Sequence, residues 1–170
     1  IGFVTRGPGA TNASIGVHTA MQDSSPMILF IGQVGVNDKG REAFQEVDYR
    51  AFFTPLAKWA TEIDNPDRIP EIISRAWHMA LSGRPGPVVV ALPEDMLTTL
   101  TESKPCQPVM IAEAGVDKDG LTQALEMLSA AENPLIIAGG GGWNAAGKKA
   151  LQHFAESQNI AVSAAFRYHD

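Results

Sequence analysis

Short apolar runs alternate with helical patterns along the first half of this sequence. The runs span Ile1 to Thr5, Met27 to Ile31 and Val88 to Leu92. A continuous apolar run of this length is typical of a strand in a sheet that is covered on both faces. Between the last two runs, residues 69–80 repeat apolar side chains at i, i+3 and i+4, which indicates an amphipathic helix. The sequence therefore predicts an α/β fold, a mostly parallel sheet with helices on both faces.

The expected helices in this half begin at recognisable capping residues. Thr11 and Asn12 are good N-cap types, so we expect the first helix to run from Asn12 to Gln22. Asp48 is expected to cap a short helix that ends at Phe52 or Phe53. A short strand is expected within residues 57–63, before the amphipathic helix that Asn65 and Pro66 open.

The pattern changes in the second half. From Glu94 to Ala114 there is no sustained period, and Pro105 and Pro108 interrupt the chain, which favours a linker. A second α/β unit follows, with expected helices at 117–128 and 145–157 and expected strands at 134–138 and 160–164. Two strands are too few for a stable sheet. We therefore expect a domain at 1–95, a linker at 96–114 and the start of a second, Rossmann-like α/β domain at 115–170.

Composition excludes several classes of partner. The 170 residues carry a net charge of −6, which disfavours a nucleic-acid partner. No apolar run approaches the roughly 20 residues that span a bilayer, so we expect no membrane partner. The single cysteine, Cys106, cannot form an internal disulfide, which fits a reducing, cytoplasmic compartment. Because both ends of the chain fall at expected strands, we expect a piece of a longer polypeptide.

A glycine-rich turn stands between the first strand and the first helix, at Thr5 to Asn12. A strand that breaks into a Gly-Pro-Gly turn and continues as a helix presents free backbone N–H groups. Glycines there let the backbone come close to a ligand, where a side chain would block it. The alternative is a tight strand-to-helix turn that binds nothing, since such turns are common in α/β folds.

Four short motifs together resemble the thiamine-diphosphate-dependent enzymes of the acetolactate synthase type, in the family's order and with closely similar spacing. They are Gly7 to Asn12, Ile31 to Val34, Ala43 to Glu46 and Ser82 to Val88. The resemblance implies that residues 1–95 are the later part of a pyrimidine-binding domain. It also implies that the residues after the linker begin the family's central domain.

The resemblance implies a reaction as well. In this family the thiazolium carbon of the cofactor attacks the carbonyl of a 2-keto acid as an ylide, and carbon dioxide leaves. The product is then protonated or transferred to a second carbonyl compound. The family's activating glutamate and its Gly-Asp-Gly segment for Mg²⁺ and diphosphate would lie outside this stretch, so we expect the fragment alone to be inactive. The family's sites lie between subunits, which implies a homodimer or homotetramer.

The resemblance also implies roles for particular residues. Gly7, Pro8, Gly9 and Asn12 would lie by the pyrimidine end of the cofactor. The family pattern has Gln45 reaching into the active site and Phe44 lining the substrate approach, so both are candidate catalytic residues. An amide offers a donor and an acceptor to a polar substrate. The alternatives are an N-cap role for Asn12 and plain loop positions for Phe44 and Gln45.

Departures from the family pattern leave other interpretations open. Glu94 stands where acetolactate synthases carry a lysine, which argues against that particular activity. FAD is an alternative cofactor only, because no flavin-specific residue stands out beyond the glycine run at 139–142. The four histidines, His18, His78, His153 and His169, lack metal-ligand spacing, so we assign no metal ligand. A non-catalytic nucleotide-binding or regulatory α/β module, or an oligomerisation domain, is the alternative function.

Overall fold

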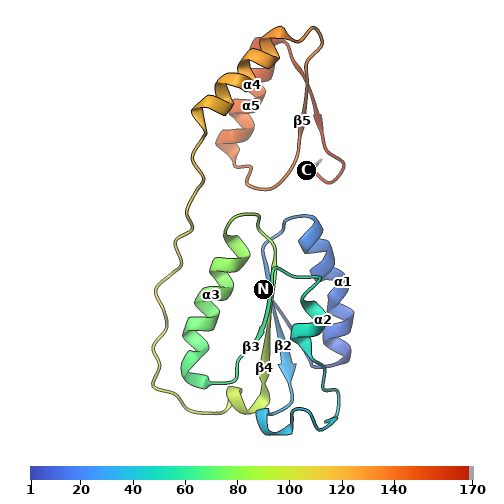
Figure 1. The fold of residues 1–170 in the computed structure, drawn as a ribbon, viewed down its shortest axis with the longest axis vertical. Coiled ribbons are helices and arrows are strands. Elements are labelled where there is room, and N and C mark those ends of the chain that lie inside the picture. Colours follow the sequence, from blue (N-terminus) through green and yellow to red (C-terminus); the bar gives the residue numbers. More distant parts are fainter. Residues whose placement is uncertain (169–170) are drawn as a thin grey trace. The chain divides into compact units, whose positions relative to one another are not determined.

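The computed structural model describes residues 1–168 and divides the chain into two compact units (Figure 1). The first unit runs from Ile1 to Ile111, and the second begins at Ala112. Each unit has its own sheet, so each is described by itself.

The first unit is built on a four-stranded parallel sheet with the order β1-β2-β4-β3. Its strands are β1 (Gly2–Val4), β2 (Met27–Gln33), β3 (Trp59–Glu62) and β4 (Pro87–Pro93). The two central strands pair along their whole length, from Met27 opposite Pro87 to Gln33 opposite Pro93. The predicted parallel α/β sheet is therefore confirmed.

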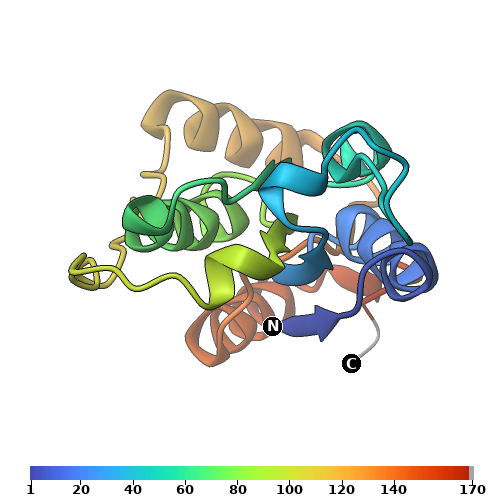
Figure 2. The same ribbon diagram turned by 90° about the horizontal axis from the view of Figure 1, so that it is seen from below.

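Helices cover both faces of this sheet (Figure 1, Figure 2). α1 (Pro8–Gln22) and the short α2 (Tyr49–Phe53) pack on one face, and α3 (Ile69–Leu81) packs on the other. β2 and β4 supply side chains to both cores, because successive residues of a strand point to opposite faces. This double coverage explains why both strands read as continuous apolar runs.

The first helix begins earlier than the sequence predicts. Gly7 is its N-cap, and Pro8 occupies the first helical position, where a residue without an N–H is well tolerated. Thr11 and Asn12 lie inside the helix, so the prediction that they cap it was wrong. The hydroxyl of Thr11 donates to the carbonyl oxygen of Pro8 at 3.0 Å instead. A glycine with positive φ followed by proline outweighs the capping preference of threonine and asparagine here.

The first strand is not the buried strand that its apolar residues predict. β1 lies at the edge of the described sheet and pairs with β2 alone. The side chain of Phe3 is 72% exposed, although its ring stacks on that of Phe30 with centroids 4.8 Å apart. An apolar edge strand is unusual in a free protein, because unpaired edges favour association.

The other predicted elements of the first unit are present. Asp48 caps α2 and accepts a hydrogen bond from the backbone N–H of Ala51 at 3.0 Å. Asn65 caps the short 3₁₀ turn η2 (Pro66–Arg68), which leads into α3. Two further 3₁₀ turns, η1 (Val36–Asp38) and η3 (Glu94–Leu97), follow the carboxyl ends of β2 and β4.

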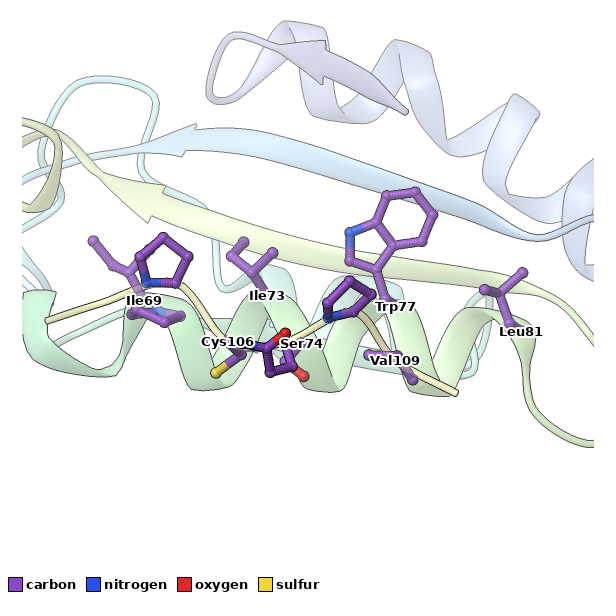
Figure 3. Close-up of a pocket in the computed structure, with 11 residues that line it drawn as sticks. Ile69, Ile73, Ser74, Trp77, Leu81, Cys106 and Val109 are labelled. Carbon is purple, nitrogen blue, oxygen red and sulfur yellow. The ribbon is translucent and has the colours of Figure 1, made fainter. Parts of the chain in front are cut away.

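The segment after η3 is extended and packs against the first unit. The hydroxyls of Thr101 and Ser103 donate to Asp67, at 2.6 Å to its carboxylate and 2.9 Å to its carbonyl. Residues 105–109 then run along α3 and enclose with it an apolar pocket of about 550 Å³ (Figure 3). The predicted linker is therefore attached to α3 over part of its length.

The second unit contains α4 (Lys118–Ala130), β5 (Leu135–Ala138), α5 (Ala145–Gln158) and β6 (Ala161–Ala164). Its two strands are parallel, and Asp117 caps α4 as predicted. Leu135 and Ile137 on β5 are more than half exposed. The division of the chain into a pyrimidine-binding domain, a linker and the start of a central domain stays a prediction.

Within residues 1–168, none of the helices combines the length and the apolar character that crossing a lipid bilayer requires.

Candidate functional site

Three of the four motifs meet at the carboxyl edge of the parallel sheet. The Gly-Pro-Gly turn follows β1, and the segment from Ile31 to Val34 forms the end of β2. The loop that carries Ala43 to Glu46 also leaves this end of β2. Ligands of open α/β sheets bind outside the carboxyl ends of the strands, so this edge is the candidate site.

The tertiary structure brings Gly7 and Gln45 into direct contact. A Cβ atom added to Gly7 would lie 2.8 Å from the Cβ of Gln45, closer than non-bonded carbon atoms approach. Gly7 also has a φ of +57°, which strains any residue with a side chain. The close approach of Gln45 and the positive φ therefore each require glycine at position 7, whether or not a ligand binds there. Gly9 is constrained in the same way, since a Cβ there would lie 2.9 Å from Cγ2 of Thr5.

A buried tyrosine forms a hydrogen bond to the glycine turn at this contact. The hydroxyl of Tyr49 accepts a hydrogen bond from the backbone N–H of Gly7 at 2.7 Å, and the side chain is 2% exposed. Burial raises the pKa of Tyr49 above its ordinary value of 10, so the hydroxyl stays uncharged near neutral pH. Sequence reasoning missed this residue. The only signal was an aromatic residue directly after the Asp48 cap.

Gln45 adopts a backbone conformation that is rare for its residue type. Its φ is +64°, in the left-handed region, which costs roughly 1–2 kcal/mol for a residue other than glycine. Strained backbone of this kind gathers at binding and catalytic sites, where the surrounding structure holds it in place. The strained backbone makes Gln45 a candidate site residue.

The remaining predicted site residues present exposed side chains near this contact. Pro8 and Asn12 are both exposed and stand four residues apart on α1, so they share one face of its first turns. Phe44 precedes Gln45 and is 78% exposed. Among the described residues, none caps the amino end of α1 with a side chain. Its first turn thus keeps N–H donors and a partial positive charge toward this surface.

A buried polar network anchors the loop between β2 and α2. Glu62, 7% exposed at the end of β3, forms an ion pair with Lys39 of the loop and accepts from Nε2 of Gln33 at 3.4 Å. The same Gln33 nitrogen donates to the carbonyl oxygen of Val47 at 2.9 Å. Gln33 thus connects the end of β2 to the last part of the loop and to Glu62, which holds Lys39.

Two further carboxylates shape the same loop. Asp95, just after β4, accepts from the backbone N–H of Val36 at 3.2 Å to each of its oxygens. Glu46 accepts from the N–H groups of Gly40 at 2.6 Å and Ala43 at 3.2 Å. The bonds of Glu46 fold residues 40–46 back on themselves around Gln45, and the bond of Asp95 ties the start of the loop to the end of β4.

An ion pair beside the glycine turn crosses the carboxyl edge of the sheet. Nη1 of Arg6 lies 3.1 Å from Oε2 of Glu94. To bring Arg6 to Glu94, the turn passes close to β2 at Gly32. A Cβ added to Gly32 would lie 3.4 Å from the backbone nitrogen of Arg6. Glu94, the residue noted above as a departure from the acetolactate synthase pattern, therefore links the end of β4 to Arg6 of the turn.

The fourth motif lies at the opposite, amino edge of the sheet, where β4 begins at Pro87. The guanidinium of Arg84 donates to the carbonyl oxygens of Met21 and Gln22 at 3.0 and 3.1 Å, and to the hydroxyl of Ser24. It thereby satisfies the last carbonyls of α1. This motif has a structural role in the first unit.

The described residues contain no group of three or more His, Cys, Asp or Glu side chains that could hold a metal ion. His169, one of the four histidines considered in the sequence, lies outside the described residues.

Comparison with known protein families shows the family of this chain. Residues 1–52 match the model of the N-terminal TPP binding domain of thiamine pyrophosphate enzymes, and residues 121–169 match the model of the central domain of those enzymes. The two matches occur in the order in which the family arranges the domains. The chain belongs to the thiamine pyrophosphate enzyme family.

Within this family, the chain is similar to proteins of the acetolactate synthase group. It is 36% identical to acetolactate synthase isozyme 3 large subunit of Escherichia coli K12, over 94% of this chain and 29% of that protein. It is 39% identical to the acetolactate synthase large subunit of Lactococcus lactis, over 81% of this chain and 25% of that protein. It is 35% identical to glyoxylate carboligase of Escherichia coli O157:H7, over 93% of this chain and 27% of that protein. The chain thus spans less than a third of the length of these relatives.

The residues at the carboxyl edge fit one wall of a site for thiamine diphosphate, the cofactor that the family implies. The first turn of α1 offers backbone donors, and the amides of Asn12 and Gln45 can each donate and accept, as a polar heterocyclic ring requires. The exposed rings of Pro8 and Phe44 add apolar surface beside them. The donors and the apolar surface together suit a flat ring with polar edges.

Proposed function

We propose that the full-length protein is a thiamine-diphosphate-dependent enzyme that decarboxylates a 2-keto acid and either protonates the product or joins it to a second carbonyl compound. The observation that carries this proposal is the contact between the glycine turn and Gln45 at the sheet edge, within residues that match the family's TPP binding domain. The relatives named acetolactate synthase and glyoxylate carboligase support the same reaction class. A nucleotide-binding or regulatory module is disfavoured, because two domains of the family are matched in one chain.

Thiamine diphosphate supplies, when bound, the carbon nucleophile that adds to the keto carbonyl and the electron sink for the loss of carbon dioxide. The backbone of Gly7, Pro8 and Gly9 would support the pyrimidine end of the cofactor. Asn12, one helical turn after Pro8, would contact the same end of the cofactor through its amide. In this role the four residues would bind and orient the cofactor, and none of their side chains is charged.

Gln45 and Phe44 would act on the substrate side. The backbone of Gln45 sets the direction of its Cα–Cβ bond, and its amide can donate to a carbonyl or carboxylate oxygen of the keto acid. The exposed ring of Phe44 would line the approach and exclude water once substrate and the rest of the enzyme cover it. Gln45 and Phe44 are therefore the candidate catalytic residues of this chain.

The rest of the assembly belongs to the proposal as well. Mg²⁺ and the diphosphate would be held by a domain outside this chain, and the active enzyme would be a homodimer or homotetramer acting in the cytoplasm. Because this chain contains only one wall of the site, it would be inactive alone. FAD stays the alternative second cofactor, and a visible flavin absorption band in the purified full-length protein would reveal it.

Isothermal titration of the full-length protein with thiamine diphosphate in the presence of Mg²⁺ tests this function. We expect saturable binding, and carbon dioxide release from pyruvate or glyoxylate that depends on the cofactor. Product analysis then separates simple decarboxylation from carbon–carbon bond formation. A correctly folded full-length protein that binds no thiamine diphosphate would refute the proposal.

A further inference from the structure

The glycine turn and the loop carrying Phe44 and Gln45 come from different parts of the sequence, but one side chain joins them. Tyr49 begins α2, four residues after Gln45, and its hydroxyl accepts from the N–H of Gly7, 42 residues away in the chain. The two segments also touch directly at Gly7 and Gln45. The hydroxyl thus fixes the turn at the point where the loop rests on it.

The ring of Tyr49 is itself held rigidly. It belongs to the core between α1 and the sheet, with Ala10 and Val17 of α1 and Ile31 of β2. Its ring centroid lies 6.5 Å from that of Phe53, one helical turn further along α2. A side chain fixed by packing can hold a hydrogen-bond partner with little freedom, which is what a precise site needs.

The hydrogen bond satisfies a backbone donor that helix geometry leaves free. Gly7 is the N-cap of α1, and the N–H groups at this end have no acceptor within the helix. A buried N–H without an acceptor is costly, so the turn would shift toward water if the hydroxyl were lost. Any shift of Gly7 also moves its neighbour Pro8 and the contact with Gln45.

We propose that Tyr49 is a positioning residue: its hydroxyl locks the Gly7 turn to the loop of Phe44 and Gln45, so that the cofactor side and the substrate side of the site keep a fixed spacing. This inference rests on the proposed function. Tyr49 touches neither cofactor nor substrate, and it acts through Gly7 and Gln45.

The test replaces Tyr49→Phe in the full-length protein, which removes the hydroxyl and keeps the ring. Hydrogen exchange, followed by mass spectrometry, is measured on peptides covering residues 5–12 and 43–48. We expect faster exchange in both peptides, because the lock joins both. The affinity for thiamine diphosphate with Mg²⁺ and the values of kcat and KM for the keto acid are measured on the same preparation. We expect cofactor affinity or kcat to fall about tenfold, the size of one lost buried hydrogen bond.

Ile72→Val is the matched control. It opens a small cavity in the core on the other face of the sheet, which α3 helps to form, away from Tyr49 and Gly7. If Tyr49 acted only through stability, Ile72→Val would reduce affinity and kcat as much as Tyr49→Phe at an equal loss of melting temperature. We expect instead that the control lowers the melting temperature and changes kcat and affinity less than twofold.

The outcomes separate the two proposals. A wild-type protein that binds cofactor, combined with a Tyr49→Phe variant of equal affinity, kcat and exchange, overturns the positioning role and leaves the proposed function standing. Equal kinetic losses in Tyr49→Phe and Ile72→Val, at an equal loss of melting temperature, overturn it as well. Absence of cofactor binding by the wild type overturns the proposed function and the positioning role with it.

Discussion

Arg6 and Glu94 join the carboxyl ends of β1 and β4 across the strand between them, with Nη1 and Oε2 3.1 Å apart. Glu94 stands where the resemblance to acetolactate synthases led us to expect a lysine. The pair lies beside the Gly-Pro-Gly turn, so the departure from the family pattern affects how the turn is held. Its charges partly cancel, which distinguishes this surface from one carrying a free lysine.

A double-mutant cycle with Arg6→Ala and Glu94→Ala should give a coupling free energy below about 1 kcal/mol, because Glu94 is mostly exposed and water screens the pair. Denaturant unfolding of the full-length protein measures it. In contrast, Glu94→Lys should weaken the structure of the turn more than Glu94→Gln, since it places two cations together. Equal stability of these two variants would show that the pair does not shape the turn.

Gly7→Ala should destabilise the full-length protein by at least about 2 kcal/mol, because alanine strains the backbone at φ +57° and its Cβ meets Gln45 at 2.8 Å. Gly16→Ala in the same helix is the control. A Cβ at Gly16 meets nothing within 4 Å, so that substitution should stabilise by roughly 0.5–1 kcal/mol. Unfolding midpoints that move in the same direction for both variants would contradict the contact at Gly7.

Gln45→Ala should lower kcat of the full enzyme by about tenfold or more while changing the unfolding free energy by at most about 1 kcal/mol. The amide is lost, but the loop is held by other residues. Gln45→Gly sharpens the test, because glycine adopts φ +64° without strain and should keep or raise stability. An unchanged kcat in both variants would remove Gln45 from the site.

Arg84→Ala should cost about 1–2 kcal/mol of stability and leave kcat and KM of the full enzyme within twofold, since Arg84 closes the far end of α1. Arg84→Lys should recover only part of the stability, because an ammonium cannot reproduce the planar fork in which Nη2 reaches two carbonyls and Nε reaches the hydroxyl of Ser24. A loss of cofactor affinity in Arg84→Ala, at unchanged stability, would place the fourth motif in the site after all.

The candidate site could be only partly predicted from the sequence. The glycine turn was found because glycine and proline leave a local signature, and the Ala43 to Glu46 segment was found through its resemblance to the family. Tyr49 could not be found, since its role depends on a contact 42 residues away in the chain. The close approach of Gln45 to Gly7 and the ion pair of Arg6 with Glu94 are likewise products of strand order, which local patterns do not encode.

The sequence by itself determined the alternation of strands and helices, the parallel sheet with two covered faces, and the family to which the chain belongs. These follow from residue periodicity and from short motifs, which act over a few residues. The tertiary structure alone decided that β1 is an exposed edge, that Thr11 and Asn12 lie inside α1, and that three motifs converge while the fourth lies at the opposite edge. The physical reason is that burial, close contacts and hydrogen bonds between distant segments arise only when the strands take their places in the sheet.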